Sequence, residues 1–235
     1  MGSEMCIRDR GNTLGEFAID TGIEENILVI GDSSGKSTLL RNMIHRISEG
    51  IPPSDAKLLV IDYRRQLLGE CPATHLAGYA STKQDVQEFI SQLVPLLESR
   101  MPAGVDDPQT LRDRSWWKGP DIFLVVDDYD LVATSSGNPL QGLLELLPYG
   151  RDIGLHMVVA RRCTGFSRTS FEPIMARLRE LHPTIFLMSG TAEEGIIAGG
   201  RKARSLSKGR ADVISNQGTH QVVQFAHHVG EEKTE

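Results

Sequence analysis

The sequence predicts an α/β fold with a mostly parallel central sheet, flanking helices and a C-terminal β-hairpin. Apolar runs of strand length alternate with longer amphipathic stretches, the pattern of parallel strands joined by helices. A glycine-rich turn connects the first apolar run to the first amphipathic stretch. Near the end of the chain, alternating residues flank an NQG turn at 216–218, which is typical of a hairpin.

Five apolar runs are expected to form the sheet. The first, Asn26–Ile30, reads NILVI, and the second, KLLVI, covers residues 57–61. Continuous runs rich in Val, Ile and Leu are typical of buried strands. The other predicted strands are residues 122–126, 155–160 and 184–188.

Helices are expected between these strands. The stretch 82–100 reads as a long amphipathic helix, because its apolar residues recur at helical spacing on one face; they are Val86, Phe89, Ile90, Leu93 and Leu97. The polar stretch 107–119 contains RSWWKGP and is predicted to be a loop. The remaining predicted helices are residues 36–47, 140–147, 171–181 and 192–198.

Length and composition favour one globular domain. The 235 residues are 40% hydrophobic and 24% charged, ordinary values for such a domain. We expect the domain at 11–228 and a polar tail at 229–235. Residues 1–10, MGSEMCIRDR, resemble a translated sequencing adapter and are expected to be foreign to it. The three cysteines lack metal-ligand spacing, which favours reduced cytosolic thiols.

The charge of the chain argues against duplex DNA as its main partner. Proteins that bind DNA usually present a basic surface to the phosphates, whereas this chain carries a formal net charge of −6. No apolar stretch approaches the roughly 20 residues that span a bilayer. We therefore expect membrane association only through missing segments or partners.

The strongest local motif is GDSSGKST, which follows the first predicted strand. A glycine-rich turn before a helix presents backbone N–H groups to an anion. In this motif Lys36 would reach the β- and γ-phosphates of a nucleotide and Ser37 would place its hydroxyl on Mg²⁺. The predicted nucleotide-binding residues, with ATP and Mg²⁺ as cofactors, are Gly31, Asp32, Ser33, Ser34, Gly35, Lys36, Ser37 and Thr38.

The loop is one residue shorter than the phosphate-loop pattern, which has four residues between its glycines. Here three residues separate Gly31 from Gly35. A shorter loop offers fewer inward amides, so we expect weakened phosphate binding. The plain alternative is an ordinary strand–turn–helix joint.

An acidic pair follows the predicted strand at 122–126. Asp127 would hold Mg²⁺ and Asp128 stands where motor ATPases usually carry the glutamate that activates water. Aspartate is one methylene shorter, so its carboxylate is expected to stop short. The alternative is that the pair only ends a strand and begins a turn.

Several arginines are candidates for trans-acting fingers or sensors that stabilise phosphate charge, and Arg151 is the one that we assign to catalysis. Surface solubility or a carboxylate partner is the alternative for each; the others are Arg161, Arg162, Arg201 and Arg210. Trp116 and Trp117 are expected to pack, and His156 to be a satisfied core histidine. His227 and His228 have no companion ligands, so no metal site is predicted there.

Four segments together resemble the C-terminal ATPase module of EccC-type proteins of actinobacterial type VII (ESX) secretion, which are similar to FtsK and SpoIIIE. They read VIDYRRQLL, LRDRSWWKGPDIFLVVDDYDLVAT, LLELLPYGRDIGLHMVVARR and LMSGTAEEGI. The resemblance covers about residues 15–223. It implies a RecA-like P-loop NTPase fold with a nucleotide near Lys36, Ser37, Thr38 and Asp127.

The resemblance also implies partners. Such proteins carry several ATPase modules in series behind a membrane anchor. This implies other modules of the same translocase as partners, a hexamer in the assembly, and a cytoplasmic place at the inner membrane. It further implies recruitment of secreted WXG100-type proteins through their C-terminal tails.

Two departures from the family favour a degenerate module. The family loop looks like GDxxSGKS, of which one middle residue is missing here, and Ala160-Arg161-Arg162 replaces the glutamine-containing strand end of FtsK motors. We therefore expect a weakly hydrolysing ATP-binding module that recruits substrates and regulates the translocase. The alternatives are a competent ATP-hydrolysing motor domain and an FtsK-type DNA translocase domain.

Overall fold

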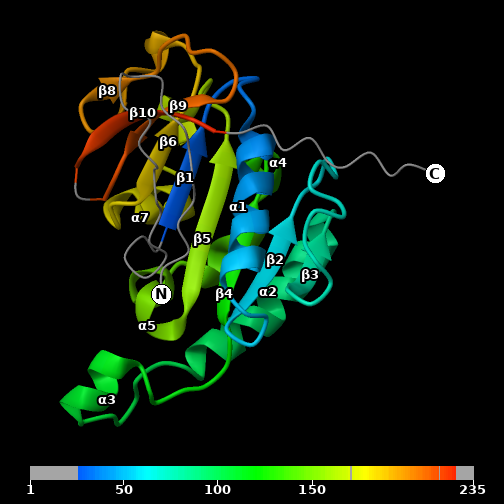
Figure 1. The fold of residues 1–235 in the computed structure, drawn as a ribbon, viewed down its shortest axis with the longest axis vertical. Helices are drawn as coiled ribbons and strands as arrows, with labels where there is room; N and C mark the ends of the chain where they lie inside the picture. Colours follow the sequence, from blue (N-terminus) through cyan, green and yellow to red (C-terminus); the bar gives the residue numbers. More distant parts are fainter. Residues whose placement is uncertain (1–25, 170, 217, 226–235) are drawn as a thin grey trace.

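An eight-stranded sheet runs through the computed structural model, which describes residues 26–169, 171–216 and 218–225 (Figure 1). The strand order is β10-β9-β6-β1-β5-β4-β2-β3. Its strands are β1 (Asn26–Ile30), β2 (Ala56–Ile61), β3 (Leu76–Ala80), β4 (Asp121–Val126), β5 (Leu155–Arg161), β6 (Thr184–Leu187), β9 (Arg210–Ile214) and β10 (His220–Gln224). A separate pair is formed by β7 (Ile196–Ala198) and β8 (Arg201–Lys202).

The strands from β3 to β6 in this order are parallel, while β9 and β10 close one side as an antiparallel hairpin. The predicted mostly parallel sheet with a C-terminal hairpin is therefore confirmed. The five predicted strands are all present, with ends that differ by at most one residue. Parallel neighbours bring their carboxyl ends to the same edge of the sheet, so the loops after β1, β2, β4 and β5 meet there.

Helices cover both faces of the sheet. The front face in Figure 1 is covered by α1, whose Leu39, Leu40 and Ile44 pack on residues such as Val29 and Val125. The other face holds a second apolar cluster with α2, η1 and α7. The helices are α1 (Lys36–Gly50), α2 (Lys83–Glu98), α3 (Pro108–Asp113), α4 (Tyr129–Val132), α5 (Gly150–Ile153), α6 (Phe166–Thr169) and α7 (Pro173–Glu180), with 3₁₀ turns η1 (Pro139–Leu143), η2 (Leu147–Tyr149) and η3 (Ala192–Glu194).

The long helix predicted at 82–100 is α2, which begins after Thr82. The Thr82 hydroxyl accepts a hydrogen bond from the Asp85 amide, while the Asp85 carboxylate accepts one from the Thr82 amide, a reciprocal cap. Val86, Ile90, Leu93 and Leu97 are buried, as the spacing predicted. No helix in the described residues is long and apolar enough to cross a membrane.

Three predicted segments were wrong in type. The predicted loop at 107–119 contains α3, because Asp107 caps the Thr110 amide and Pro108 occupies the first helical position. The predicted helix at 140–147 is a pair of 3₁₀ turns, each with a proline at its first or second position. The predicted helix at 192–198 is η3 followed by β7, which a Gly199-Gly200 turn joins to β8.

The strand β3 was missed because it lies at the sheet edge and is half-exposed. Its sequence, LAGYA, has a weak apolar pattern and includes Gly78. The glycine is required there, since a Cβ would lie 2.6 Å from the ring of Phe89 on α2. The predicted boundaries at 10 and 229 lie outside the described residues.

Candidate functional site

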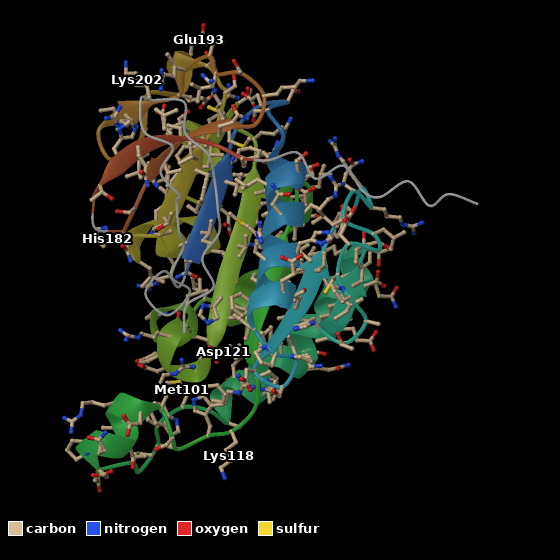
Figure 2. All side chains as sticks on the ribbon, viewed as in Figure 1. Met101, Lys118, Asp121, His182, Glu193 and Lys202 are labelled. Atoms are coloured by element: carbon tan, nitrogen blue, oxygen red, sulfur yellow. The ribbon has the colours of Figure 1, made fainter. Side chains whose placement is uncertain are left out.

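The predicted phosphate-binding motif lies at the carboxyl edge of the sheet. It forms the turn from β1 into α1, and the ends of β2, β4 and β5 surround it. In Figure 2 this edge is the upper end of the molecule, on the side of Glu193 and Lys202, whereas Asp121 marks the lower edge where β4 begins. The geometry therefore brings the acids that end β4 close to the motif.

The turn is tight, and both glycines are required. A Cβ on Gly31 would lie 2.7 Å from the Cβ of Met188, and Gly35 has a φ of 99°, in the left-handed region. Ser33 also has a positive φ, of 47°. Ser34 is buried and its Oγ has no hydrogen-bond partner among the described residues. A buried hydroxyl without a partner is costly in an apolar setting and fits a loop that binds a polar ligand.

Asp32 fastens this turn to the neighbouring strand end. Its carboxylate accepts hydrogen bonds from the amides of Cys163 and Thr164 and, at 2.8 Å, from the Thr164 hydroxyl. Its own amide donates to the Ser189 carbonyl at 2.8 Å. Because its side chain is bonded to the 163–164 turn, Asp32 holds the loop in position.

Lys36 and Ser37 begin α1 and face the acids from β4. The Lys36 ammonium donates to the Gly31 carbonyl at 3.0 Å, so the side chain folds back over the turn. The Ser37 hydroxyl donates to Asp127 Oδ2 at 2.6 Å, although the residues are 90 positions apart. Thr38 follows Lys36 and Ser37, and all three residues line one pocket beside the turn. The structure therefore brings together the two residues predicted to hold Mg²⁺.

Burial, a neighbouring charge and a hydrogen bond act on the pKa of the Asp127 carboxyl. Burial raises the pKa of this carboxyl above its ordinary value, and the neighbouring Asp128 charge raises it further. The Ser37 hydrogen bond acts in the opposite direction. A cation beside Asp127 would favour its ionised form, which is the electrostatic setting that Mg²⁺ requires.

Asp128 is held by an arginine that sequence reasoning missed. Arg64 Nε lies 2.9 Å from Asp128 Oδ2 in an ion pair. Asp128 has a φ of 46° and immediately precedes α4, between the end of β4 and that helix. The pairing follows from the adjacency of β2 and β4, for which a single sequence holds no direct signal.

Two pockets flank the turn. One, the phosphate-side pocket of about 400 Å³, is lined by the motif together with Arg64, Gln66, Asp128 and Arg162. The other, of about 360 Å³, lies between the turn and the C-terminal hairpin, where Lys208, Gly209, Gln224 and Phe225 line it. The Gly209 amide donates to the Ser34 carbonyl at 3.2 Å, which joins the hairpin to the turn. These hairpin residues were also missed.

The structure does not bring Arg151 to this site. Arg151 lies on α5, immediately before β5, and therefore at the opposite edge of the sheet. Its side chain is exposed.

The other candidate arginines lie in different parts of the fold. Arg161 is 1% exposed and bonds Asp130 Oδ1 at 2.9 Å, so it is a structural cation of the core. Arg162 lines the phosphate-side pocket. Arg210 donates to the Gln224 side chain, and Arg201 is exposed on β8.

The aromatic residues pack as expected. Trp116 Nε1 donates to the Arg100 carbonyl at 2.7 Å, and Trp117 Nε1 donates to the Asp152 carbonyl at 2.8 Å. The Arg100 guanidinium lies 4.1 Å from the centre of the Trp117 ring. His156 is buried, its Nε2 lies 3.2 Å from the Asp121 carboxylate, and its ring stacks on Phe123. Its Nδ1 has no hydrogen-bond partner among the described residues, so the expectation of a satisfied core histidine is met only in part. His227 and His228 lie outside the described residues.

The chain is similar to ATPases of bacterial secretion systems. It is 46% identical over 210 residues to ESX-4 secretion system protein EccC4 of Mycobacterium tuberculosis, covering 89% of this chain and 17% of that protein. It is 39% identical over 217 residues to ESX secretion system protein EccC of Thermomonospora curvata, covering 92% of this chain and 16% of that protein. No family model matches the chain.

Solved structures agree with these relatives. The cytoplasmic domain of the Thermomonospora curvata type VII secretion ATPase EccC superposes with a TM-score of 0.93 at 38% identity, over 97% of this chain and 27% of that one. A second structure, ATPases 2 and 3 of the same EccC in complex with a signal sequence peptide, also has a TM-score of 0.93 and 38% identity, over 97% of this chain and 41% of that one. The chain spans about a sixth of the length of the curated relatives.

Proposed function

The chain belongs with the ATPase modules of EccC-type proteins of type VII (ESX) secretion, and on that premise we propose that it binds ATP with Mg²⁺, hydrolyses it weakly, recruits export substrates and regulates the translocase. The observation that carries the proposal is the contact of Ser37 with Asp127 beside a glycine-rich turn at the start of a helix. Such an arrangement offers amides and a cation to phosphates and hard oxygen ligands to Mg²⁺.

The residues present fit a bound magnesium nucleotide. The first-turn amides of a helix lack intrahelical acceptors, and those at the start of α1 adjoin the phosphate-side pocket. Lys36 would exchange the Gly31 carbonyl for a phosphate oxygen. Among the described residues no group of three or more His, Cys, Asp or Glu could hold a metal ion, so Mg²⁺ at Ser37 and Asp127 would rely on phosphate oxygens as further ligands. When bound, Mg²⁺ would neutralise phosphate charge.

Weak hydrolysis is inferred from Asp128 and the short turn. A residue that activates water must come within about 3 Å of it. Asp128 reaches about 1.5 Å less far than glutamate would, and Arg64 engages its carboxylate. The competent motor remains the alternative, and a rapid turnover by the isolated chain would establish it.

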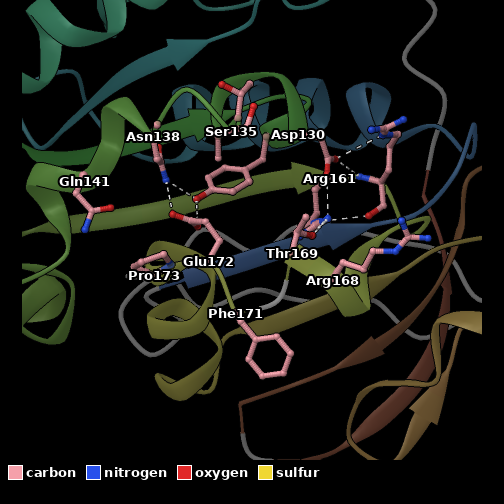
Figure 3. A pocket seen from close by; sticks show the side chains of 15 residues that line it. Asp130, Ser135, Asn138, Gln141, Arg161, Arg168, Thr169, Phe171, Glu172 and Pro173 are labelled. Carbon is pink, nitrogen blue, oxygen red and sulfur yellow. Dashed lines mark hydrogen bonds and ion pairs between the residues drawn. The ribbon is translucent and has the colours of Figure 1, made fainter.

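Recruitment of a WXG100-type tail is supported by the relative whose solved complex contains a signal sequence peptide. We propose that such a tail binds a pocket of about 640 Å³ behind the strand ends of β4 and β5 (Figure 3). Its rim includes Phe171, which is 82% exposed, together with Ala133 and Pro173. Burial of an exposed aromatic ring against an apolar side chain would stabilise such a complex by about 2 kcal/mol.

The pocket has a rigid polar floor. The Tyr129 hydroxyl donates to Glu172 Oε2 at 2.6 Å, and the Asn138 amide donates to Tyr129 and to Glu172. Glu172 also caps α7 by accepting from the Met175 amide. Figure 3 shows the Phe171 ring projecting away from Asn138 and Glu172. A rigid floor with one exposed ring lowers the ordering cost of binding.

Assembly and location complete the proposal. We propose that the module works beside other ATPase modules of the same translocase, in a hexamer, on the cytoplasmic side of the inner membrane. The relatives are several times longer than this chain, which leaves room for such modules, and one solved relative is a cytoplasmic domain. The exposed position of Arg151 at the opposite edge suits a contact in trans.

Calorimetric titration with Mg²⁺ and ATP tests nucleotide binding. The chain should bind ATP weakly, and Lys36→Ala should abolish the signal. Lys57→Ala is the matched control, since Lys57 lies at the start of β2 and donates to the Thr74 carbonyl. No heat of binding from the unaltered chain, or equal binding by Lys36→Ala, would contradict the assignment.

Fluorescence anisotropy with a labelled C-terminal peptide of a WXG100 protein from the same organism tests recruitment. Phe171→Ala should weaken binding about tenfold or more. Ile196→Ala removes another exposed apolar side chain, 63% exposed on β7, and should leave the affinity unchanged. Absence of binding at high micromolar peptide would count against recruitment, and equal effects of the two variants would count against this pocket.

A further inference from the structure

The turn after β2 is built around a buried carboxylate. Asp62 is 1% exposed and accepts hydrogen bonds from the Leu67 amide at 2.6 Å, the Tyr79 hydroxyl at 2.8 Å and the Arg64 amide at 3.1 Å. These three hydrogen bonds hold the backbone of the 62–67 turn in one conformation. The base of the Arg64 side chain is therefore fixed.

The direction of that side chain is fixed by β4. Because β2 and β4 are parallel neighbours with Ile61 opposite Val126, the residues after them lie side by side. Arg64 Nε pairs with Asp128 Oδ2 at 2.9 Å, yet the Arg64 side chain is 60% exposed while that of Asp128 is 17% exposed. An exposed ion pair contributes little stability, about 0–1 kcal/mol, so folding alone is a weak reason for it.

The pair faces the phosphate-side pocket. Arg64 and Asp128 line it together with Lys36, Ser37 and Arg162. The bond to Asp128 uses the Nε donor of Arg64, and the guanidinium fork carries further N–H donors that suit phosphate oxygens. The nearby acids have hydrogen-bond partners of their own. The Asp32 carboxylate accepts hydrogen bonds from the 163–164 turn, and the Asp127 carboxylate accepts one from Ser37.

The positions of the two pockets indicate how a nucleotide would lie across the turn. The pocket against the hairpin and the pocket against Arg64 share Ser33, Gly35 and Thr38. Phe225, whose ring lies near Gly35, and Gly209 line the former, which suits a nucleoside. A nucleotide that places its base there must extend its phosphates past the turn toward Arg64, and the last phosphate would come closest.

We propose that Arg64 recognises the terminal phosphate of a nucleoside triphosphate with the same guanidinium that holds Asp128. The inference rests on the proposed nucleotide binding and adds to it the residue that distinguishes triphosphate from diphosphate. Arg64 would then fix the position of Asp128 when that phosphate arrives. The turn amides serve the inner phosphates, which both nucleotides share, and Lys36 reaches the β- and γ-phosphates.

Calorimetry with ADP and with a non-hydrolysable ATP analogue, each with Mg²⁺, tests this. The measurements use the whole chain and, in parallel, the chain with one residue inserted between Ser33 and Ser34. Arg64→Ala should weaken binding of the analogue about tenfold or more and binding of ADP less than about twofold. Arg64→Lys, which keeps the charge but not the fork, should recover part of the loss.

Two controls separate recognition from damage. Arg46→Ala removes an exposed arginine of α1 that pairs with Glu49 away from the pocket, and it should change neither affinity. Asp128→Asn should retain the preference for the triphosphate, because Arg64 is still present. An Arg64→Ala protein with an unchanged ratio of the two affinities overturns the inference alone. Failure of the unaltered and the inserted chain to bind either nucleotide overturns the proposed function as well.

Discussion

Asp127 and Asp128 are adjacent residues with different surroundings, and the difference decides their chemistry. Asp127 is 1% exposed and bonds Ser37, whereas Asp128 reaches the surface and pairs with Arg64. Burial raises the pKa of Asp127, so loss of a bound cation would leave this carboxyl easier to protonate. The assignment of Asp127 to Mg²⁺ and of Asp128 to water stays a proposal.

We predict that Asp128→Glu raises ATP turnover only when the turn is restored to full length and a neighbouring module supplies a finger. The longer side chain would close a gap of about 1.5 Å, and misplacement by about 1 Å can cost on the order of 100-fold in rate. A coupled assay of phosphate release on the single, double and assembled forms measures this. Turnover by the unaltered isolated chain above about 1 s⁻¹, abolished by Lys36→Ala, would refute weak hydrolysis.

The sequence located Lys36, Ser37 and Asp127 because each follows a recognisable strand and stands in a motif. It did not locate Arg64, since the VIDYRR segment reveals its pairing only after β2 and β4 are known to be neighbours. Arg151 was assigned as a trans-acting finger or sensor by residue type alone; the structure places it at the opposite edge of the sheet, and its role stays a prediction. Local motifs report chain neighbours, while pairing across strands depends on topology.

The phosphate turn is the element whose length matters most. Its three residues between the glycines are accommodated by left-handed backbone at Ser33 and Gly35. We predict that insertion of one residue between Ser33 and Ser34 tightens ATP binding, because another amide could then face the phosphates. Calorimetric affinities of the two proteins decide the matter, and equal values would mean that the turn is competent at its present length.

The C-terminal hairpin depends on Asp212, a 2% exposed carboxylate on β9. Its carboxylate accepts hydrogen bonds from both Nε and Nη2 of Arg204 at 2.8 Å. His220 Nε2 on β10 lies 3.0 Å from Asp212 Oδ1. The Arg204 hydrogen bonds lower the pKa of Asp212; burial opposes them, and the His220 contact adds to the lowering. The stabilisation is therefore present above the ordinary carboxyl pKa and is lost as pH falls through the lowered value.

We predict that Asp212→Asn lowers the free energy of unfolding at pH 7 by about 1–3 kcal/mol. Stability of the variant should also fall less steeply than that of the unaltered chain as pH drops below about 4. Thermal melting between pH 7 and 3 measures both. Asp113→Asn is the control, since Asp113 lies on α3 and bonds only the nearby Gln109 side chain; an equal effect of the two variants would remove the special role of Asp212.

Element types were predictable where the apolar pattern was strong. The buried strands and α2 carry long unambiguous patterns, and their limits were nearly right. The missed β3 has half-exposed residues and a glycine dictated by Phe89 of another element. The cap of α3, Asp107 before Pro108, was readable in the sequence and was overlooked in favour of local polarity.

At the scale of the whole molecule, the sheet separates the candidate nucleotide site from Arg151. The phosphate-binding turn lies at the carboxyl edge, and α5 with Arg151 lies at the other. We predict that Arg151→Ala leaves ATP affinity of the isolated chain unchanged and lowers turnover of the assembled translocase by about 10³-fold. Assays of both forms, with Arg177→Ala as an exposed control on α7, measure this; a normal rate in the assembly would remove Arg151 from catalysis.

The central position of β1 has a consequence for synthesis of the chain. β1 carries the phosphate-binding turn and, within the described part of the chain, pairs with β5 and β6, so Leu28 finds its partner Val159 about 130 residues later. At roughly 5–20 residues per second, a ribosome would need about 7–26 s to deliver that partner. During this interval the sequence NILVI is an unpaired apolar strand, the kind of segment that chaperones bind and that aggregates. Nascent chains arrested before residue 155 should therefore be held by chaperones and unable to bind nucleotide.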